Sequence, residues 1–135
     1  IGLLVLNADQ TAFLVCEPRA DHDEATTMYL LPGGKIEAGE TDAVCLKREM
    51  REELSCGVAE ESLRLVGEYT DVSASHPDRD VMIRLCQGTL VGEPRPSSEI
   101  AKLHWIGAAL LNHPSVSPII KRKVIPDLLQ RGLLK

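Results

Sequence analysis

The chain has 135 residues and a formal charge of −5, with 44% hydrophobic, 26% charged and 3% aromatic residues. This length and composition predict a single globular domain over residues 1–135. A negative surface with few aromatic rings argues against a nucleic acid polymer as partner, and an anionic substrate would need a bound cation.

The cysteines and the apolar runs indicate the compartment. Four widely spaced cysteines form no C-x-x-C pair, so we expect buried, reduced thiols in a cytoplasmic protein. No apolar run approaches the roughly 18 residues of a membrane span, so we expect no membrane association. The chain begins at Ile1 within an apolar run, and we expect the natural N-terminus to lie a few residues upstream.

Apolar runs separated by polar turns indicate strands at the start of the chain. Residues 1–6 and 12–16 are predicted to be buried strands joined as a hairpin by a polar turn. A charged, irregular loop follows over residues 17–27. The next strand, residues 28–31, is predicted to be short because it stops at the breaker Pro32-Gly33-Gly34.

A helix is predicted from Thr41 to Leu54, where the spacing of apolar residues becomes helical. Thr41 or Glu40 can begin this helix, and Asp42 favours its positive end. The expected buried stripe consists of Val44, Leu46, Met50 and Leu54.

The second half of the chain predicts longer strands and a terminal helix. The strands are expected at residues 63–69, 81–91 and 103–106. The helix is expected over residues 117–132, and Pro126 should kink or divide it. Its apolar positions are Ile120, Val124, Leu128 and Leu129. This order of elements predicts an α/β or α+β domain in which helices cover a mixed sheet.

Three glutamates in the first helix suggest a metal site. Glu49, Glu52 and Glu53 are spaced i, i+3 and i+4, which places their side chains on one helical face. Three like charges this close need an offset, and Mg²⁺ prefers carboxylate oxygens. A solvated acidic face, partly paired with neighbouring Lys and Arg residues, is the alternative that the glutamates alone leave open.

The loop before the helix favours a ligand site. The backbone of Gly33-Gly34 can approach a metal or a phosphate closely because glycine has no side chain. Glu40 precedes Arg48 by eight residues, close enough for an ion pair that would clamp the loop onto the helix.

The segment from Gly34 to Glu53 resembles the Nudix box, G-x5-E-x7-R-E-U-x-E-E-x-G-U, where U is a bulky aliphatic residue. The matching residues are Gly34, Glu40, Arg48, Glu49, Met50, Glu52 and Glu53. The resemblance implies a Nudix-type α/β/α sandwich with a mixed central sheet. One departure is that Ser55 replaces the late Gly, and we expect Gly57 to serve as a displaced cap after a slightly longer helix.

The resemblance also implies roles for the residues of the box. Glu49, Glu52 and Glu53 would coordinate Mg²⁺ or Mn²⁺ and take part in catalysis, helped by the carbonyl of Gly33. Gly34, Glu40 and Arg48 would be structural. Looser similarity to MutT-like members after the long strands makes Glu99 a candidate base, with an ordinary exposed loop glutamate as the alternative.

The implied reaction is attack of water on a phosphorus of a nucleoside diphosphate linked to another group. A nucleoside triphosphate, cleaved to a monophosphate and pyrophosphate, is the favoured substrate. Leu31 stands where purine-binding members often have an aromatic residue, which weakens a role toward oxidised guanine nucleotides. The expected substrate contacts are Lys35 for phosphate and Tyr29 and Arg79 for the base or sugar. Trp105 would be another such contact or, more simply, a core residue.

Other classes remain open from the sequence. The chain would alternatively hydrolyse ADP-ribose, a sugar nucleotide or a dinucleoside polyphosphate, or it would be a non-catalytic module that senses a nucleotide. Homodimers are common among Nudix proteins, but no interface is evident in the chain. The four histidines have no ligand spacing, and we expect surface or capping positions for them.

Overall fold

The computed structural model describes residues 1–19, 28–72, 78–97, 99–110 and 113–135. Most of the loop predicted over residues 17–27, together with His22 and His76, lies outside these residues. The elements are β1 (Gly2–Leu4), β2 (Phe13–Pro18), α1 (Asp42–Leu54), β3 (Gly57–Val58), η1 (Glu60–Ser62), β4 (Arg64–Val72), β5 (Asp80–Gln87), β6 (Leu90–Val91), β7 (Ile100–Ile106), η2 (Ala108–Leu110), η3 (Ile120–Val124) and α2 (Ile125–Gln130).

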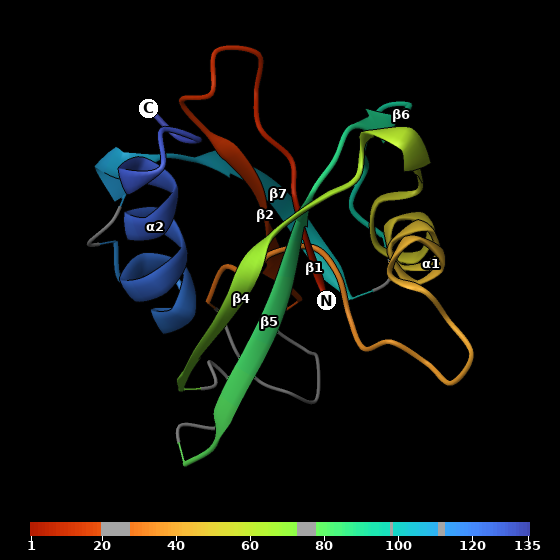
Figure 1. Cartoon of the computed structure of the whole chain (residues 1–135), viewed down its shortest axis with the longest axis horizontal. Helices are drawn as coiled ribbons and strands as arrows, with labels where there is room; N and C mark the ends of the chain where they lie inside the picture. Colours follow the sequence, from red (N-terminus) through yellow and green to blue (C-terminus); the bar gives the residue numbers. More distant parts are fainter. Residues whose placement is uncertain (20–27, 73–77, 98, 111–112) are drawn as a thin grey trace.

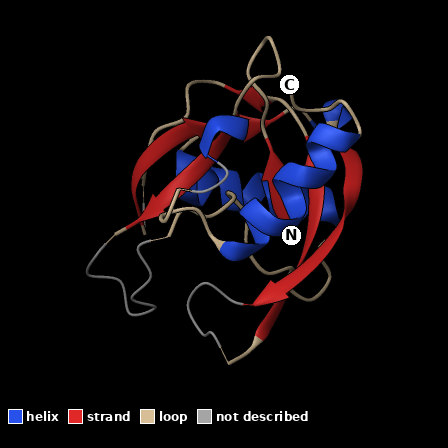
Figure 2. Ribbon diagram, turned by 90° about the vertical axis from the view of Figure 1, so that its left-hand side faces the viewer, coloured by secondary structure: helices blue, strands red, loops and turns tan. Residues whose placement is uncertain are grey.

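The strands form a central layer between the two helices, with α1 on one side and α2 on the other (Figure 1). Seen from the side of α2, strands lie behind this helix and to both sides of it (Figure 2). β5 pairs in parallel with β1 and antiparallel with β4, while β2 pairs antiparallel with β7. This arrangement confirms the expected α/β/α order with a mixed sheet. No described helix is long and apolar enough to cross a membrane.

Two apolar cores fill the spaces on either side of the strands, because successive strand residues point to opposite faces. Leu4 and Val15 face the core under α2, whereas Leu3 and Leu14 face the core under α1. The uninterrupted apolar runs of β1 and β2 therefore serve both layers. All four cysteines are free and buried, as the sequence predicted.

The predicted hairpin of the first two runs is only partly correct. A bridge between Leu6 and Phe13 closes the turn, but the ladder partners of β1 and β2 are β5 and β7. A two-stranded hairpin is only marginally stable alone, and the ladders with β5 and β7 build both runs into the larger sheet layer. The predicted strand at residues 28–31 is reduced to isolated bridges, which join Tyr29 to Val116 and Leu30 to Cys16.

The strand predicted over residues 81–91 is divided into β5 and β6. Gly88 lies at the break, and a Cβ at this position would approach Leu63 Cδ2 to 2.8 Å. A larger residue here would displace this leucine side chain at the point where the chain leaves the long ladder. β4 and β7 are longer than predicted, since both extend along their partners beyond the apolar runs.

Both helices differ from the predicted apolar stripes by one position. In α1, Cys45 is buried and Val44 is 49% exposed, so Val44 does not belong to the core. In the terminal helix, Ile125 is buried and Leu129 is 37% exposed. A π-helical turn, η3, precedes Pro126, which lies in the first turn of α2 where its missing N–H is tolerated.

The predicted cap at Gly57 is wrong. α1 ends at Leu54, and Ser55 itself adopts the left-handed conformation, with φ 55° and ψ 34°. The Ser55 N–H donates to the carbonyls at the end of the helix, while Gly57 is already part of β3. Ser55 thus occupies the conformation that the Nudix pattern assigns to glycine, at a steric cost.

Candidate active site

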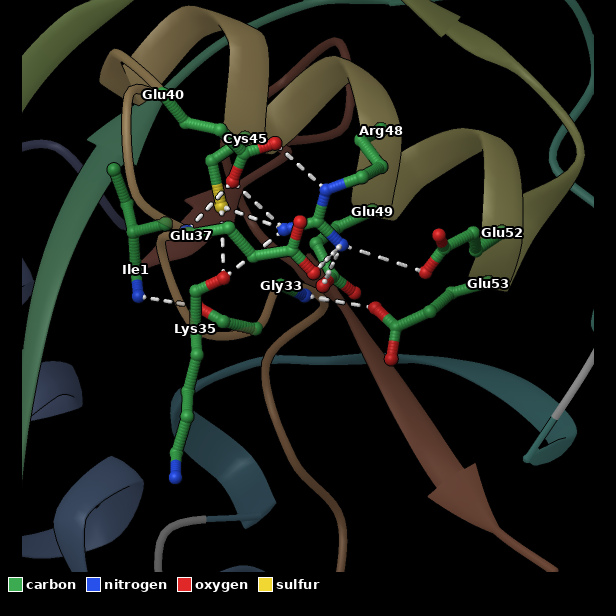
Figure 3. Close-up of polar contacts among 11 residues, drawn as sticks. Ile1, Gly33, Lys35, Glu37, Glu40, Cys45, Arg48, Glu49, Glu52 and Glu53 are labelled. Carbon is green, nitrogen blue, oxygen red and sulfur yellow. Dashed lines mark hydrogen bonds and ion pairs between the residues drawn. The ribbon is translucent and has the colours of Figure 1, made fainter.

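The helix α1 carries the glutamates of the site (Figure 3). It begins where the Thr41 hydroxyl accepts a hydrogen bond from the Val44 N–H at 3.2 Å. Burial of Leu46 and Met50 against the central strands fixes the rotation of the helix. That rotation leaves the glutamate face directed toward the loop at residues 33–40.

An ion pair joins this loop to the helix. Arg48 donates from Nε to Glu40 Oε2 at 2.7 Å and from Nη2 to Glu40 Oε1 at 2.9 Å. Nη2 also donates to the carbonyl of Lys35 at 3.0 Å. The Arg48 guanidinium and, next, the Glu37 N–H lower the pKa of Glu40 to about 2. The ion pair expected from the sequence is therefore present, and its paired hydrogen bonds hold the loop against the helix.

The glycines of the loop contact two of the glutamates directly. The Gly33 N–H donates to Glu53 Oε1 at 2.9 Å. Gly33 has a φ of 144°, and a Cβ there would clash with the carbonyl of Ile1. A Cβ on Gly34 would clash with the carboxylate of Glu49. Gly33 therefore requires glycine because of its backbone conformation and the Ile1 backbone, whereas a side chain at Gly34 would force the Glu49 carboxylate to move.

The carboxylates accumulate negative charge in a half-buried position. Burial is the main cause that raises the pKa of Glu53 to about 7, and the hydrogen bond from the Gly33 N–H lowers this pKa. The charges of Glu49, Glu99 and Glu52 raise it further. Burial also raises the pKa of Glu49, against the opposing effect of Arg48. Such a cluster is unfavourable unless a cation or protons neutralise it.

The three box glutamates do not converge on one point in this conformation. Glu49 Oε1 accepts from Arg48 Nη1 at 2.8 Å, and the Glu52 side chain is 55% exposed. Among the residues that the structure describes, no three His, Cys, Asp or Glu side chains are grouped closely enough to hold a metal ion. The donor set nevertheless fits a hard divalent cation, because it consists of carboxylate oxygens whose charges repel one another at Glu53.

The connector after β6 brings Glu99 toward the same charges. The Ser97 N–H donates to the carbonyl of Glu53 at 2.9 Å, and the Ser97 hydroxyl donates to the carbonyl of Glu52 at 2.5 Å. The connector thereby satisfies backbone groups at the end of α1. Glu99, two residues later, is exposed and close enough to raise the pKa of Glu53. The contacts made by Ser97 could not be predicted from local sequence patterns.

The predicted substrate contacts differ in their relation to a pocket that adjoins Gly33 and Gly34. Lys35 lines it, and its side chain points away from α1 (Figure 3). Arg79 is exposed just before β5, two residues from the pocket residue Val81. Tyr29 does not line the pocket, because its ring stacks on His104 with the centroids 4.5 Å apart.

The other aromatic predictions have mixed outcomes. Trp105 is 49% exposed on β7, so its interpretation as a core residue is wrong. The His113 ring also stacks on Tyr29, with the centroids 5.9 Å apart, and His104 Nε2 lies 3.0 Å from Glu17 Oε1. These two histidines are half-buried ring partners of Tyr29. Their association with Tyr29 could not be predicted from spacing along the chain.

The pocket has a volume of about 340 Å³ and adjoins the carboxylates through Gly33 and Gly34. One of its lining residues, Ser117, is 1% exposed and lies just before Pro118 and the terminal helix.

Comparison with known proteins agrees with the fold and the box. The model of the NUDIX domain family matches residues 1–128. The chain therefore belongs to the NUDIX domain family. It is 39% identical over 90 residues to a protein of Mycobacterium tuberculosis described as a candidate 8-oxo-dGTP diphosphatase 2. That match covers 66% of this chain but only 60% of the relative's length.

Solved structures show the same fold at low sequence identity. The MutT protein from Methanosarcina mazei Go1 superposes with a TM-score of 0.74 at 17% identity, covering 99% of this chain and 93% of that one. A MutT NUDIX hydrolase from Burkholderia pseudomallei gives 0.72 at 20% identity and covers 94% of each chain. The E. coli ORF135 protein gives 0.68 at 19% identity, covering 97% and 87%.

Proposed function

We propose that residues 1–135 act as a divalent-metal-dependent hydrolase of a nucleoside diphosphate linked to a further group. A nucleoside triphosphate, cleaved to a monophosphate and pyrophosphate, is the favoured substrate. The observation that carries this proposal is the half-buried carboxylate of Glu53, which lies on the Gly33 amide among the charges of other glutamates. Membership of the NUDIX domain family supports it.

Glu49, Glu52 and Glu53 would hold the cation, with the carbonyl of Gly33 as a further ligand. The family makes Mg²⁺ the first choice and Mn²⁺ the second. When bound, the ion would neutralise phosphate charge and activate water for attack on phosphorus. A nucleotide sensor, the non-catalytic alternative, would not need three carboxylates beside the Gly33-Gly34 loop.

The chain's own residues would then position the reaction and accept a proton. The Arg48–Glu40 pair holds the loop, so that Glu49 and Glu53 keep fixed places relative to the glycine amides. Glu99 lies near Glu53 and is exposed, which suits a base that takes a proton from the attacking water. Lys35 offers a positive charge beside the glycines for a substrate phosphate.

The substrate class can be tested with a panel of compounds and identification of the products. The panel consists of nucleoside triphosphates, 8-oxo-dGTP, ADP-ribose, a sugar nucleotide and a dinucleoside polyphosphate, each with Mg²⁺ or with EDTA. The name of the M. tuberculosis relative brings 8-oxo-dGTP into the panel. Metal-dependent release of a monophosphate and pyrophosphate from triphosphates would support the proposal. Folded protein that cleaves no compound would contradict it and favour a sensor.

A further inference from the structure

The terminal segment, η3 with α2 and the residues just before them, forms one wall of the pocket beside the carboxylates. Ile119 and Ile120, at the start of this segment, line the pocket together with Val81 and Ile83 of β5. β5 belongs to the central layer, whereas the terminal segment packs on that layer through buried apolar side chains. Apolar contacts have no preferred direction, so they do not by themselves fix where this wall lies relative to β5. Polar contacts are directional, and they can fix it.

Two polar contacts tie the terminal segment to β4, the strand next to β5. Arg122 Nη2 donates to Asp71 Oδ1 at 2.5 Å. The Tyr69 hydroxyl donates to Asp127 Oδ2 at 2.6 Å, and Arg131 Nη1 donates to the same oxygen at 3.1 Å. Burial and, next, the hydrogen bond to Asp127 raise the pKa of Tyr69 to about 12. The phenol of Tyr69 therefore remains a hydrogen-bond donor at any pH at which the protein would work.

Both contacts start from residues of β4 that lie beside the pocket. In the ladder between β4 and β5, Tyr69 is paired with Ile83 and Asp71 is paired with Val81. Directly paired residues of an antiparallel ladder share one face of the sheet. The side chains of Tyr69 and Asp71 therefore adjoin the two β5 side chains that line the pocket. The ties connect the terminal segment to the sheet next to this cavity.

A π-helical turn lets the terminal segment reach β4 at two places. Arg122 lies in η3, and Arg131 directly follows α2. The distance from residue 122 to residue 131 corresponds to about two and a half turns of a regular α-helix, which would place these side chains on opposite sides. Both nevertheless reach β4, since Arg122 contacts Asp71 and Arg131 Nη1 donates to the carbonyl of Val66 at 2.8 Å. The wider winding of the π turn reduces the rotation between them, and such turns are frequent at functional sites.

We propose that Tyr69 and Asp71 are positioning residues, whose contacts with Asp127 and Arg122 hold the wall formed by the terminal segment in place for the substrate. This inference rests on the proposed function, because the pocket adjoins the carboxylates through Gly33-Gly34 and would receive the part of the substrate beyond the diphosphate. When a contact is lost, the segment populates positions in which the wall does not fit. The apparent affinity then falls in proportion to the population that still fits. Binding of the diphosphate is unaffected, since α1 would hold its cation.

The test compares Tyr69→Phe, which removes only the donating hydroxyl, with a matched hydroxyl deletion elsewhere. Ser62→Ala is the control, because the Ser62 hydroxyl donates to the carbonyl of Ala59, accepts from the Thr89 N–H and does not line the pocket. Asp127→Asn is the conservative variant, since its amide oxygen can still accept from the phenol. The probes are nucleoside triphosphates whose α–β bridging oxygen is replaced by methylene, and inorganic triphosphate. Binding is measured by calorimetry with Mg²⁺, and stability is measured by thermal unfolding.

Tyr69→Phe and Arg122→Met should each weaken binding of the nucleoside analogues about threefold to tenfold, the effect of losing one hydrogen bond that holds the wall. They should raise KM without lowering kcat, and they should leave binding of inorganic triphosphate unchanged. Asp127→Asn should bind the analogues nearly as tightly as wild type. Ser62→Ala should lower the melting temperature and change neither affinity.

Two results would overturn the inference. If Tyr69→Phe lowers the melting temperature but binds the analogues as tightly as wild type, the contact is purely structural. An equal loss of affinity for inorganic triphosphate would show that the contact acts on the carboxylates instead of the pocket. If wild-type protein hydrolyses nucleotides while Tyr69→Phe binds them normally, only this inference fails. If wild-type protein binds no nucleotide, the proposed function fails with it.

Discussion

Replacement of Glu53 by glutamine should stabilise the metal-free protein while it abolishes function. The pKa of Glu53 is raised from an ordinary 4.5 to about 7, first by burial and then by neighbouring carboxylates. The unfolded chain therefore ionises Glu53 near pH 4.5 and the folded chain near pH 7, so stability is lost as the pH rises between these values. Allowing for the partial exposure of the side chain, its ionisation costs about 2–3 kcal/mol above pH 7. Glutamine stays neutral and can still accept the hydrogen bond from Gly33.

The assay is urea unfolding in EDTA at pH 8 and at pH 5, with Glu52→Gln as the control. Glu53→Gln should exceed wild type by about 2–3 kcal/mol at pH 8 and by less than about 1 kcal/mol at pH 5. Glu52 is 55% exposed, so Glu52→Gln should change stability little at either pH. Equal stability of wild type and Glu53→Gln at pH 8 would refute the reasoning that Glu53 carries the unfavourable charge.

Three further substitutions test the geometry around the glutamates. Ser55→Gly should raise the free energy of unfolding by about 1 kcal/mol, because glycine adopts the left-handed cap without strain, and a loss of stability in urea would disprove this. Gly34→Ala should displace the Glu49 carboxylate and reduce metal-dependent turnover. Gly57→Ala is the control, because a Cβ at Gly57 would meet only ordinary contacts, and its turnover should be unchanged. Equal turnover of the two variants would contradict the predicted clash at Gly34. Arg48→Lys should lower turnover by about tenfold to a hundredfold, because lysine cannot make the paired hydrogen bonds to Glu40 that fix the loop. Turnover equal to wild type would show that the Arg48–Glu40 pair is dispensable.

Local patterns predicted the parts of the fold that depend on neighbouring residues. The helical spacing and the Thr41 cap located α1 to within a residue, and the separation of Glu40 from Arg48 predicted their ion pair. Partners distant in the chain were beyond such patterns. The two N-terminal runs looked like a hairpin because nothing local reveals that β5 and β7 would pair with them.

The site shows the same division between local and long-range information. The glutamate face follows from helical spacing, but the position of Glu99 depends on a connector that binds the end of α1 through Ser97. The sequence favoured Gly57 as the left-handed cap because glycine adopts that conformation more easily than serine. Gly57 is already part of β3, so the helix ends two residues earlier and Ser55 is the cap.

The most direct test of the proposed function is the dependence of diphosphate hydrolysis on Mg²⁺ and on Glu53. Turnover of the best substrate in the panel would be followed in EDTA and during titration with Mg²⁺, for wild type, Glu53→Gln and Ser115→Ala. Ser115→Ala serves as the control because Ser115 does not line the pocket. Wild type and Ser115→Ala should be inactive in EDTA and fully active with Mg²⁺, and Glu53→Gln should lose nearly all turnover while it remains folded. Turnover of wild type in EDTA, or near-normal Mg²⁺-dependent turnover of Glu53→Gln, would contradict the assignment of this site.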